Sequence, residues 1–509
     1  MQYAGKKQLC SAVFGYGYTH VSNNLIQVLK LWHLQDRIFR RPIAEFRVLL
    51  HCAEANKTPL HGACADLLVH LVSDALTETA YLASVCELGS SLAANDDGFS
   101  MRVHGFDDKL LDLFGALFEL MMAFRGRIDG TMPEDIQHGR FELCLEFYRR
   151  QLINGGMKAS KLATGVRIRC LRPTSWSSKQ KVSSCCLIDC LLAATLISRQ
   201  HKHEQFKAIE ELDVPTFVTT IASILDKIGV EAIFHGNVDA DDAKRAQDEI
   251  MRRLSKNSGG GLPRKKYPQQ LVLRVPQSSY TLKCLAEDPT DPNTAVELYF
   301  QVGKDNTRDR VMVDLLMGMM YEPLYHQIRT KDQFGYHVSC DCRWTNGVIG
   351  MHFQVVTSSK SAQEAEDRLE KFIADYRQTI VDMSPSDFMY HLVALAKQKL
   401  DMFNSLREET NHYWSEIRDG RYLWDVDRQE VICLKSFTKE ETLKAYDEWL
   451  SPQGKTRRRM AIQVISSDGD ASAGRPEVPH NLDVCEYNDS CVKAFQNKHC
   501  KNQTYGRIY

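Results

Sequence analysis

The spacing of hydrophobic residues divides the chain into two series of strands and helices. In the first series it predicts a short helix over Leu25–Leu34, a strand over Phe39–Leu50 and one long helix over Leu60–Glu87. Two strands follow on either side of residues 95–98, where Asn, Asp and Gly favour a tight turn. The pattern then predicts a strand over 230–235 and helices over 109–124, 133–152, 184–198, 214–228 and 241–254.

The second series repeats this order of strand, long helix, hairpin and further helices. It predicts strands over 270–275, 280–286, 295–302, 335–340, 348–353 and 460–465, and helices over 310–328, 361–381, 386–400, 408–417 and 438–450. Asn346-Gly347 indicates a hairpin, because both residues tolerate positive φ. The repetition predicts an α+β fold of two homologous domains, each a mainly antiparallel sheet with helices packed on it.

A glycine-rich and basic segment separates the two series. Gly259–Gly261 are followed by Pro263 and by the charge run Arg264–Lys266, a composition typical of a linker. We therefore predict a first domain over 25–256, a linker over 257–268 and a second domain over 269–467. Residues 1–24 stay unassigned, and residues 468–509 are predicted to form a polar C-terminal tail.

Composition is that of an ordinary globular protein. Hydrophobic residues make up 43% of the 509, charged residues make up 25%, and the net charge is −1, so no overall field attracts nucleic acid or an anionic membrane. No run reaches the roughly 20 apolar residues of a membrane span. We expect neither nucleic acid nor membrane as a partner. The 16 scattered cysteines favour reduced thiols and a cytoplasmic location, with a mitochondrial location as the alternative.

Arg329 and Tyr336 stand out as candidate chemistry. They place a guanidinium at the exit of the predicted helix and a phenol at the start of the following strand, so a hairpin folding back on its helix could present both to one cleft. The alternative is a capped helix followed by an ordinary hairpin.

Other polar groups are interpreted as structural. We interpret the basic residues Arg167, Arg169 and Arg172 as part of a solvated loop, and Cys340 and Cys342 as core residues. The basic run 455–459 either lines an inner wall that attracts anions or is a solvated strand entry, and we favour the second.

The stretch Arg329–Tyr336, RTKDQFGY, resembles the RTKEQLGY segment of the insulysin and nardilysin branch of the pitrilysin-type zinc metallopeptidases. Other segments agree in order from about residue 25 to about 465, among them Thr58–His61, Val103–Lys109 and His235–Val238. The resemblance implies the third and fourth domains of that family, with the LuxS/MPP-like metallopeptidase fold. It identifies the chain with the C-terminal half of a clamshell that closes around a peptide.

The family's inverted zinc motif, H-x-x-E-H, is not found in this sequence. His51-Cys52-Ala53-Glu54-Ala55 has alanine in place of the second ligand, and His201-Lys202-His203-Glu204 has the wrong order. We interpret both sets as surface histidines. No metal residues and no catalytic residues are therefore assigned, no cofactor is expected on this chain, and zinc is expected in a partner N-terminal half.

The resemblance gives Arg329 and Tyr336 a substrate-binding role. In the family these positions reach the zinc domain, contact the peptide backbone and help to stabilise the tetrahedral species. We expect a non-catalytic half of an oligopeptide-hydrolysing enzyme, inactive alone, with a peptide substrate and a zinc-bearing N-terminal half or homologous subunit as partners. The alternatives are a structural or adaptor subunit, like a processing-peptidase partner or a respiratory-complex core subunit, and a binding protein for polyanions.

The first 22 or so residues do not resemble the family. A truncated gene model, two halves on separate chains and a free-standing non-catalytic relative would each account for this.

Overall fold

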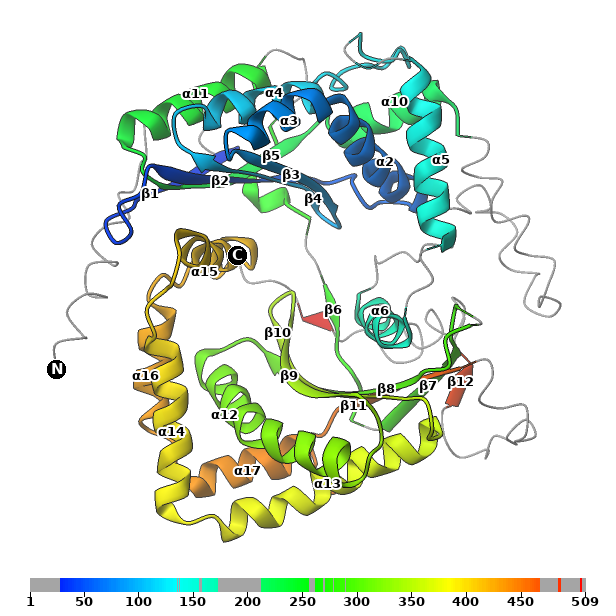
Figure 1. The fold of residues 1–509 in the computed structure, drawn as a ribbon, viewed down its shortest axis with the longest axis vertical. Coiled ribbons are helices and arrows are strands. Elements are labelled where there is room, and N and C mark those ends of the chain that lie inside the picture. Colours follow the sequence, from blue (N-terminus) through cyan, green and yellow to red (C-terminus); the bar gives the residue numbers. More distant parts are fainter. Residues whose placement is uncertain are drawn as a thin grey trace.

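The computed structural model describes residues 28–172, 212–255 and 261–466, apart from positions 135, 137, 155–157, 269–270, 278 and 289, together with strands at 484–486 and 504–505. Figure 1 shows two sheets facing each other, with most of the helices on their outer sides. The predicted helix over 184–198 and the histidines at 201 and 203 lie outside the described residues.

The first sheet has five strands in the order β1-β5-β2-β4-β3. All its neighbours are antiparallel except β1 and β5, which run parallel. Its strands are β1 (Leu29–Gln35), β2 (Ile43–Cys52), β3 (Gly89–Asn95), β4 (Gly98–Phe106) and β5 (Ile228–Gly236).

Helices cover the outer face of this sheet. Alternate residues of β2, such as Phe46, Val48 and Leu50, are fully buried in a core shared with these helices. The helices are α2 (Pro59–Ala75), α3 (Thr77–Val85), α4 (Leu110–Met122), α5 (His138–Asn154), α10 (Val214–Ile224) and α11 (Ala240–Ser255).

The second sheet has six strands in the order β12-β7-β11-β8-β10-β9. At the hairpin between β9 and β10, Asn346 and Gly347 have φ angles of 47° and 79°, so the predicted turn is confirmed. The strands are β7 (Ser279–Leu285), β8 (Thr294–Lys304), β9 (His337–Thr345), β10 (Val348–Thr357), β11 (Arg459–Ile465) and β12 (Val484–Glu486). A separate pair joins β6 (Val272–Leu273) to β13 (Thr504–Tyr505).

The second set of helices follows the sequence prediction more closely. Thr438 and Glu441 form the capping box at the start of α17, in which each side chain bonds to the other residue's backbone N–H. The set comprises α12 (Thr307–Leu324), η3 (Tyr325–Lys331), α13 (Ala362–Asp382), α14 (Pro385–Leu400), α15 (Leu406–Arg418), α16 (Val426–Leu434) and α17 (Lys439–Trp449). Within the described part of the chain, no helix has the length and apolarity needed to span a membrane.

Each series contributes one helix to the sheet of the other series. Helix α6 (Ala159–Leu171) packs on the inner face of the second sheet, while α15 packs against β2 and β5 of the first. Figure 1 shows both helices between the two sheets. The α+β fold with two sheet-and-helix units is thereby confirmed, while the domain boundaries given above stay a prediction.

Three interpretations of the fold were wrong. Residues 29–35 form strand β1 because they pair in register with buried β5, so tertiary pairing outweighs a short helical pattern. The long helix breaks at Leu76 into α2 and α3. The basic stretch at 167–172 is not a solvated loop: Arg167 lies in α6 and is buried. Helices α6 and α16 were not predicted.

A buried ion pair holds α6 on the second sheet, and a hydrogen bond from a buried arginine holds α15 on the first. Glu297 on β8 is fully buried, and the Arg167 Nε of α6 lies 2.5 Å from its carboxylate. On the first sheet, the Arg47 guanidinium donates to Asn411 of α15 at 2.7 Å and also to Glu45. Although burial opposes ionisation, hydrogen bonds and charges from Arg102 and Arg47 hold the pKa of Glu45 below its usual value. These polar contacts add to the apolar packing that joins each helix to its sheet.

His235 on β5 makes the docking of α15 sensitive to acid. Its ring is buried and lies 2.8 Å from the Thr410 hydroxyl of α15, and burial lowers its pKa from 6.5 to about 4. The unfolded chain therefore binds more protons than the folded chain between those values. We expect the free energy of unfolding to fall as pH drops from about 6.5 to about 4, by at most about 3 kcal/mol.

The measurement is urea unfolding across that pH range. The Glu409 carboxylate, 3.7 Å from Nε2, would attract an imidazolium and keeps the loss below that limit. His235→Asn should flatten this part of the profile, whereas the exposed His326→Gln should leave it unchanged. Identical profiles for the wild type and His235→Asn would exclude His235 as the source.

Candidate functional site

Helix α12 and the π-helical segment η3 carry the first candidate residue. Asn306 begins α12 by accepting a hydrogen bond from the Asp309 N–H. Near the other end, Pro323 cannot donate to the Met319 carbonyl, four residues earlier, and the Tyr376 hydroxyl of α13 donates to that carbonyl at 2.6 Å. The chain continues as the wider helix η3, a form that often occurs at functional sites.

Arg329 is exposed on η3, as the sequence analysis requires of a binding residue. Its guanidinium carbon lies 4.8 Å from the centroid of the Tyr325 ring, a cation–π contact that orients the side chain. No carboxylate in the described part of the chain pairs with it. The guanidinium therefore keeps its donors available for a ligand.

The turn after η3 is fixed by contacts on both sides. The Asp332 N–H donates to the Gln327 carbonyl at 2.9 Å, and the Gln327 amide donates to the Asp332 carboxylate at 3.0 Å. Arg368 of α13 donates to the same carboxylate at 2.5 Å. Phe334 adds a backbone hydrogen bond to the Ile328 carbonyl at 3.0 Å. The loop between the two candidates is thus held in one shape.

Gly335 and Tyr336 bring the chain onto strand β9. A Cβ atom at Gly335 would lie 1.8 Å from the Val356 carbonyl oxygen of β10, so the backbone can pass this point only without a side chain. Tyr336 follows directly and is 89% exposed, with its phenol in solvent. The two candidate residues therefore lie on either side of a turn that other residues hold in place.

Gly335→Ala should displace this turn. The added Cβ would overlap a backbone oxygen that belongs to a paired strand and cannot move alone, so we expect a loss of about 2–3 kcal/mol in the free energy of unfolding. Chemical denaturation measures this loss. Gly303→Ala is the matched control, because nothing lies near the position of its Cβ. Equal losses for the two variants would contradict the close approach.

In the basic run at 455–459 the three arginines are paired or buried, which corrects the preferred interpretation for them, whereas Lys455 is exposed. Arg457 pairs with Glu370 of α13 at 2.6 Å, and Arg459 is buried against Glu366 and Glu370. Arg458 donates to the Val275 carbonyl at 2.5 Å. Carboxylates neutralise Arg457 and Arg459, and Arg458 is buried, so the three arginines offer little charge to an anionic ligand.

His51 is buried, which corrects its interpretation as a surface histidine. Its ring stacks on Tyr267 with the centroids 4.0 Å apart, and its nitrogens lie 3.6 Å from Asp97 and 3.9 Å from Glu231. Burial opposes protonation, but the two carboxylates outweigh it and raise the pKa of His51. Over the described residues, no group of three or more His, Cys, Asp or Glu side chains is arranged to hold a metal ion.

The described cysteines are free thiols, and most are buried. Burial raises the pKa of Cys64 and Cys284 to about 12, so these thiols stay protonated and unreactive. Cys340 is buried in the core, as predicted, and the half-buried Cys342 packs against that core and donates to the Asp314 carboxylate at 3.0 Å. Three further cysteines, at positions 185, 186 and 190, lie outside the described residues.

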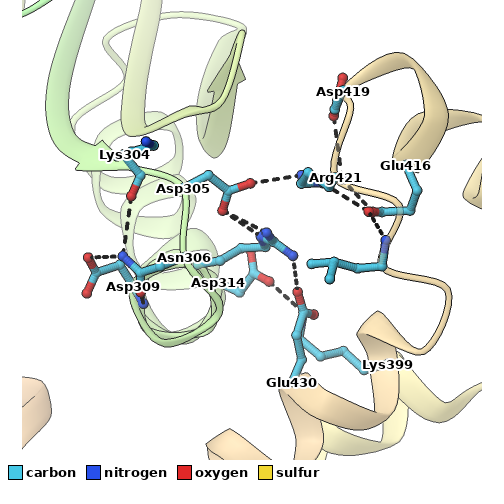
Figure 2. A network of polar contacts seen from close by, with 12 residues as sticks. Lys304, Asp305, Asn306, Asp309, Asp314, Lys399, Glu416, Asp419, Arg421 and Glu430 are labelled. Carbon is cyan, nitrogen blue, oxygen red and sulfur yellow. Dashed lines mark hydrogen bonds and ion pairs between the residues drawn. The ribbon is translucent and has the colours of Figure 1, made fainter. Parts of the chain in front are cut away.

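A polar network that the sequence analysis missed anchors the start of α12. Figure 2 shows Asp305 facing Arg421, which lies beyond α15 and donates to it at 3.1 Å. Asp305 also accepts from Arg310 at 2.7 Å. Glu430 of α16 accepts from Arg310 at 2.9 Å and from Lys399 of α14 at 2.6 Å. Asp305 and Arg310 are 5 residues apart, but the other partners are 31 to 120 residues apart, so local spacing could not reveal the network.

Two known family domains match separate parts of the chain. "Middle or third domain of peptidase_M16" matches residues 24–184. "PQQ synthase PqqF-like, C-terminal lobe domain 4" matches residues 315–414, which include Arg329 and Tyr336.

Curated relatives are similar over most of this chain. Insulin-degrading enzyme from Homo sapiens is 28% identical over 461 residues, which cover 89% of this chain and 41% of that protein. Nardilysin from Mus musculus is 27% identical over 437 residues, which cover 86% and 34%. A nardilysin-like protein from Arabidopsis thaliana is 24% identical over 444 residues, which cover 86% and 40%. The chain spans about two fifths or less of the length of these relatives.

Solved structures share the fold. Pitrilysin superposes with a TM-score of 0.72 at 17% identity, over 96% of this chain and 46% of that one. A peptidase M16 inactive domain from Pseudomonas fluorescens superposes with a TM-score of 0.57 at 13% identity, over 86% of this chain and 96% of that one.

Proposed function

We propose that this chain is the peptide-binding, non-catalytic half of a zinc endopeptidase. The proposal starts from the middle and C-terminal domains of the M16 peptidases that the chain contains, and from its homology to insulin-degrading enzyme and nardilysin over most of its length. The zinc that M16 peptidases use would be supplied by an N-terminal half or a homologous subunit. The observation that carries the proposal is the pair of exposed donors, Arg329 and Tyr336, on either side of one fixed turn.

The chemistry of the pair suits a peptide backbone under attack. A guanidinium and a phenolic O–H both donate hydrogen bonds, and donors held in advance at a carbonyl oxygen stabilise the negative charge that develops there. The hydrogen bonds of Asp332 and the close approach at Gly335 keep the turn in its shape, so little reorganisation is needed when a peptide binds. In this proposal the chain binds and polarises the substrate, and the metal that activates water lies elsewhere.

The proposal is tested by zinc analysis, peptide binding and complementation. The chain alone should bind a fluorescent oligopeptide, contain well below one zinc per chain and show no turnover of a quenched peptide. Adding an N-terminal M16 half that carries H-x-x-E-H should produce turnover that depends on Arg329 and Tyr336. One zinc per chain together with turnover by the chain alone would overturn the proposal.

An adaptor subunit built from the same paired domains predicts a different result. Such a protein would form a stable complex with another subunit and show no peptide binding that responds to Arg329→Gln or Tyr336→Phe. The exposure of both side chains favours the peptidase function, because an adaptor would not need either hydrogen-bond donor on its surface.

A further inference from the structure

An aromatic cluster joins the first sheet to the segment between α15 and α16. Trp32 of β1 lies edge-on to Trp424 with the ring centroids 4.7 Å apart, and its ring is 5.7 Å from that of Tyr422. Tyr413 and Ile417 of α15 continue the cluster beneath them. These rings come from segments about 390 residues apart in sequence, and none belongs to the site described above.

The ammonium of Lys30 occupies this cluster. Its Nζ lies 4.2 Å from the centroid of the Trp32 ring and 4.0 Å from that of the Tyr422 ring, so two π faces bound it. These distances are typical of cation–π contacts, and two such faces form the kind of aromatic cage that receives quaternary and methylated ammonium groups. Here the cation is supplied by the chain itself.

The N–H donors of Lys30 lack protein partners. Among the described residues, no oxygen accepts a hydrogen bond from Lys30, and none forms an ion pair with it. The nearby carboxylate, Glu231, is engaged by the Tyr422 hydroxyl at 2.7 Å. Arg264 adds a second positive charge beside the same ring, 4.8 Å from the Tyr422 centroid. A half-buried ammonium with π faces in place of acceptors is costly to desolvate.

We propose that Lys30 is a site of N-methylation and that its methylated ammonium is held in the cage formed by Trp32 and Tyr422. Methyl groups replace N–H donors that have no acceptor, keep the positive charge and contact the ring faces directly. Methylation therefore suits this lysine better than a lysine paired with a carboxylate, such as Lys109 with Asp112 at 3.1 Å.

The lowered pKa of Lys30 also favours methylation. Burial and the charge of Arg264 lower the pKa of Lys30 to about 8, against the opposing effect of Glu231, so a substantial fraction is neutral at physiological pH. The neutral nitrogen attacks the methyl carbon of a sulfonium donor, and the carbon–sulfur bond breaks. Its electron pair stays on sulfur, which leaves as a thioether, and the amine proton passes to solvent.

Methylation at this position would strengthen the connection between the two sheets. Lys30 and Trp32 belong to the first sheet, whereas Tyr422 follows Arg421, which is tied to Asp305 at the end of β8 (Figure 2). A tighter contact at the cage thus acts on the segment that joins the sheets. This inference does not depend on the proposed peptidase function.

Reductive methylation with ¹³C-formaldehyde and an amine–borane tests the cage in the intact chain. Each lysine nitrogen condenses with formaldehyde, loses water and is reduced by hydride, and a second round gives the dimethylamine. Ring currents should shift one pair of methyl signals upfield of all others in the NMR spectrum. That signal should be absent in Lys30→Arg and present in Lys109→Arg.

Variants at Tyr422 distinguish loss of the aromatic ring around Lys30 from a general loss of structure. Tyr422→Phe keeps the ring and should keep the shifted signal, whereas Tyr422→Leu should move the Lys30 signal to the position of the exposed lysines. Mass spectrometry of the chain from its native cells should find methyl groups on the peptide that contains Lys30. An unshifted Lys30 signal, a Lys30 that formaldehyde cannot reach, or a native chain without methyl groups there would each overturn the proposal.

Discussion

Tyr336→Phe should lower the turnover of a complemented enzyme by about 100-fold while changing peptide affinity less than threefold. The phenol is 89% exposed at the start of β9, so its loss removes one donor and leaves the surrounding packing intact. A donor aimed at a developing oxyanion stabilises the transition state more than the bound peptide. The measurement is kcat and KM for a quenched peptide, with Kd from fluorescence anisotropy.

The matched control is Tyr321→Phe, which removes a hydroxyl from another exposed tyrosine on the preceding helix. It should leave all three constants unchanged. Arg329→Gln should weaken both binding and turnover, because a guanidinium also contacts the ground-state carbonyl. If Tyr336→Phe changed affinity and turnover by the same factor, the phenol would serve binding only, and the oxyanion role would have to be abandoned.

Local signals predicted the parts of the fold that depend on neighbouring residues. Asn346-Gly347 specified the hairpin because positive φ is a property of those two residues, and Thr438 with Glu441 specified the start of α17 because a capping box spans one turn. Strand β1 was mistaken for a helix because its structure depends on β5, about 200 residues later. Short apolar runs do not carry that information.

The sequence predicted which residues form the candidate site, but not which contacts hold them in place. The resemblance of the stretch around Arg329 and Tyr336 pointed to both residues, and the structure places both on the surface. Their support could not be read from the sequence, because it comes from distant residues: Tyr376 at the Met319 carbonyl and Arg368 at Asp332. The need for glycine at position 335 is also explained by a distant residue, because a side chain there would overlap the Val356 carbonyl oxygen.

Buried charges gave the most misleading signal in the sequence. Arg167 was interpreted as solvated because charged residues are rarely buried without a partner. Its partner, Glu297, is 130 residues away on the other sheet. The spacing of Leu162, Val166 and Cys170 could have indicated a helix with one apolar face, and that face packs on the second sheet.

Arg167→Met should destabilise the chain by about 3–5 kcal/mol, because it leaves the Glu297 carboxylate fully buried without its cation. The Thr164 hydroxyl, 2.8 Å from the carboxylate, cannot replace a charge. Adding Glu297→Gln should recover much of that loss, because no buried charge then remains. The free energies of unfolding from urea titrations give the coupling energy of this double-mutant cycle.

The exposed pair Arg150–Glu146 provides the comparison, since its nitrogen and oxygen lie 2.8 Å apart, close to the 2.5 Å of the buried pair, but on a solvated helix face. Arg150→Met should cost less than about 0.5 kcal/mol. Hydrogen exchange should show α6 opening selectively in Arg167→Met, because this pair holds a helix of the first series on the sheet of the second. A loss no larger than that of Arg150→Met, or no recovery in the double variant, would mean that apolar packing alone holds α6.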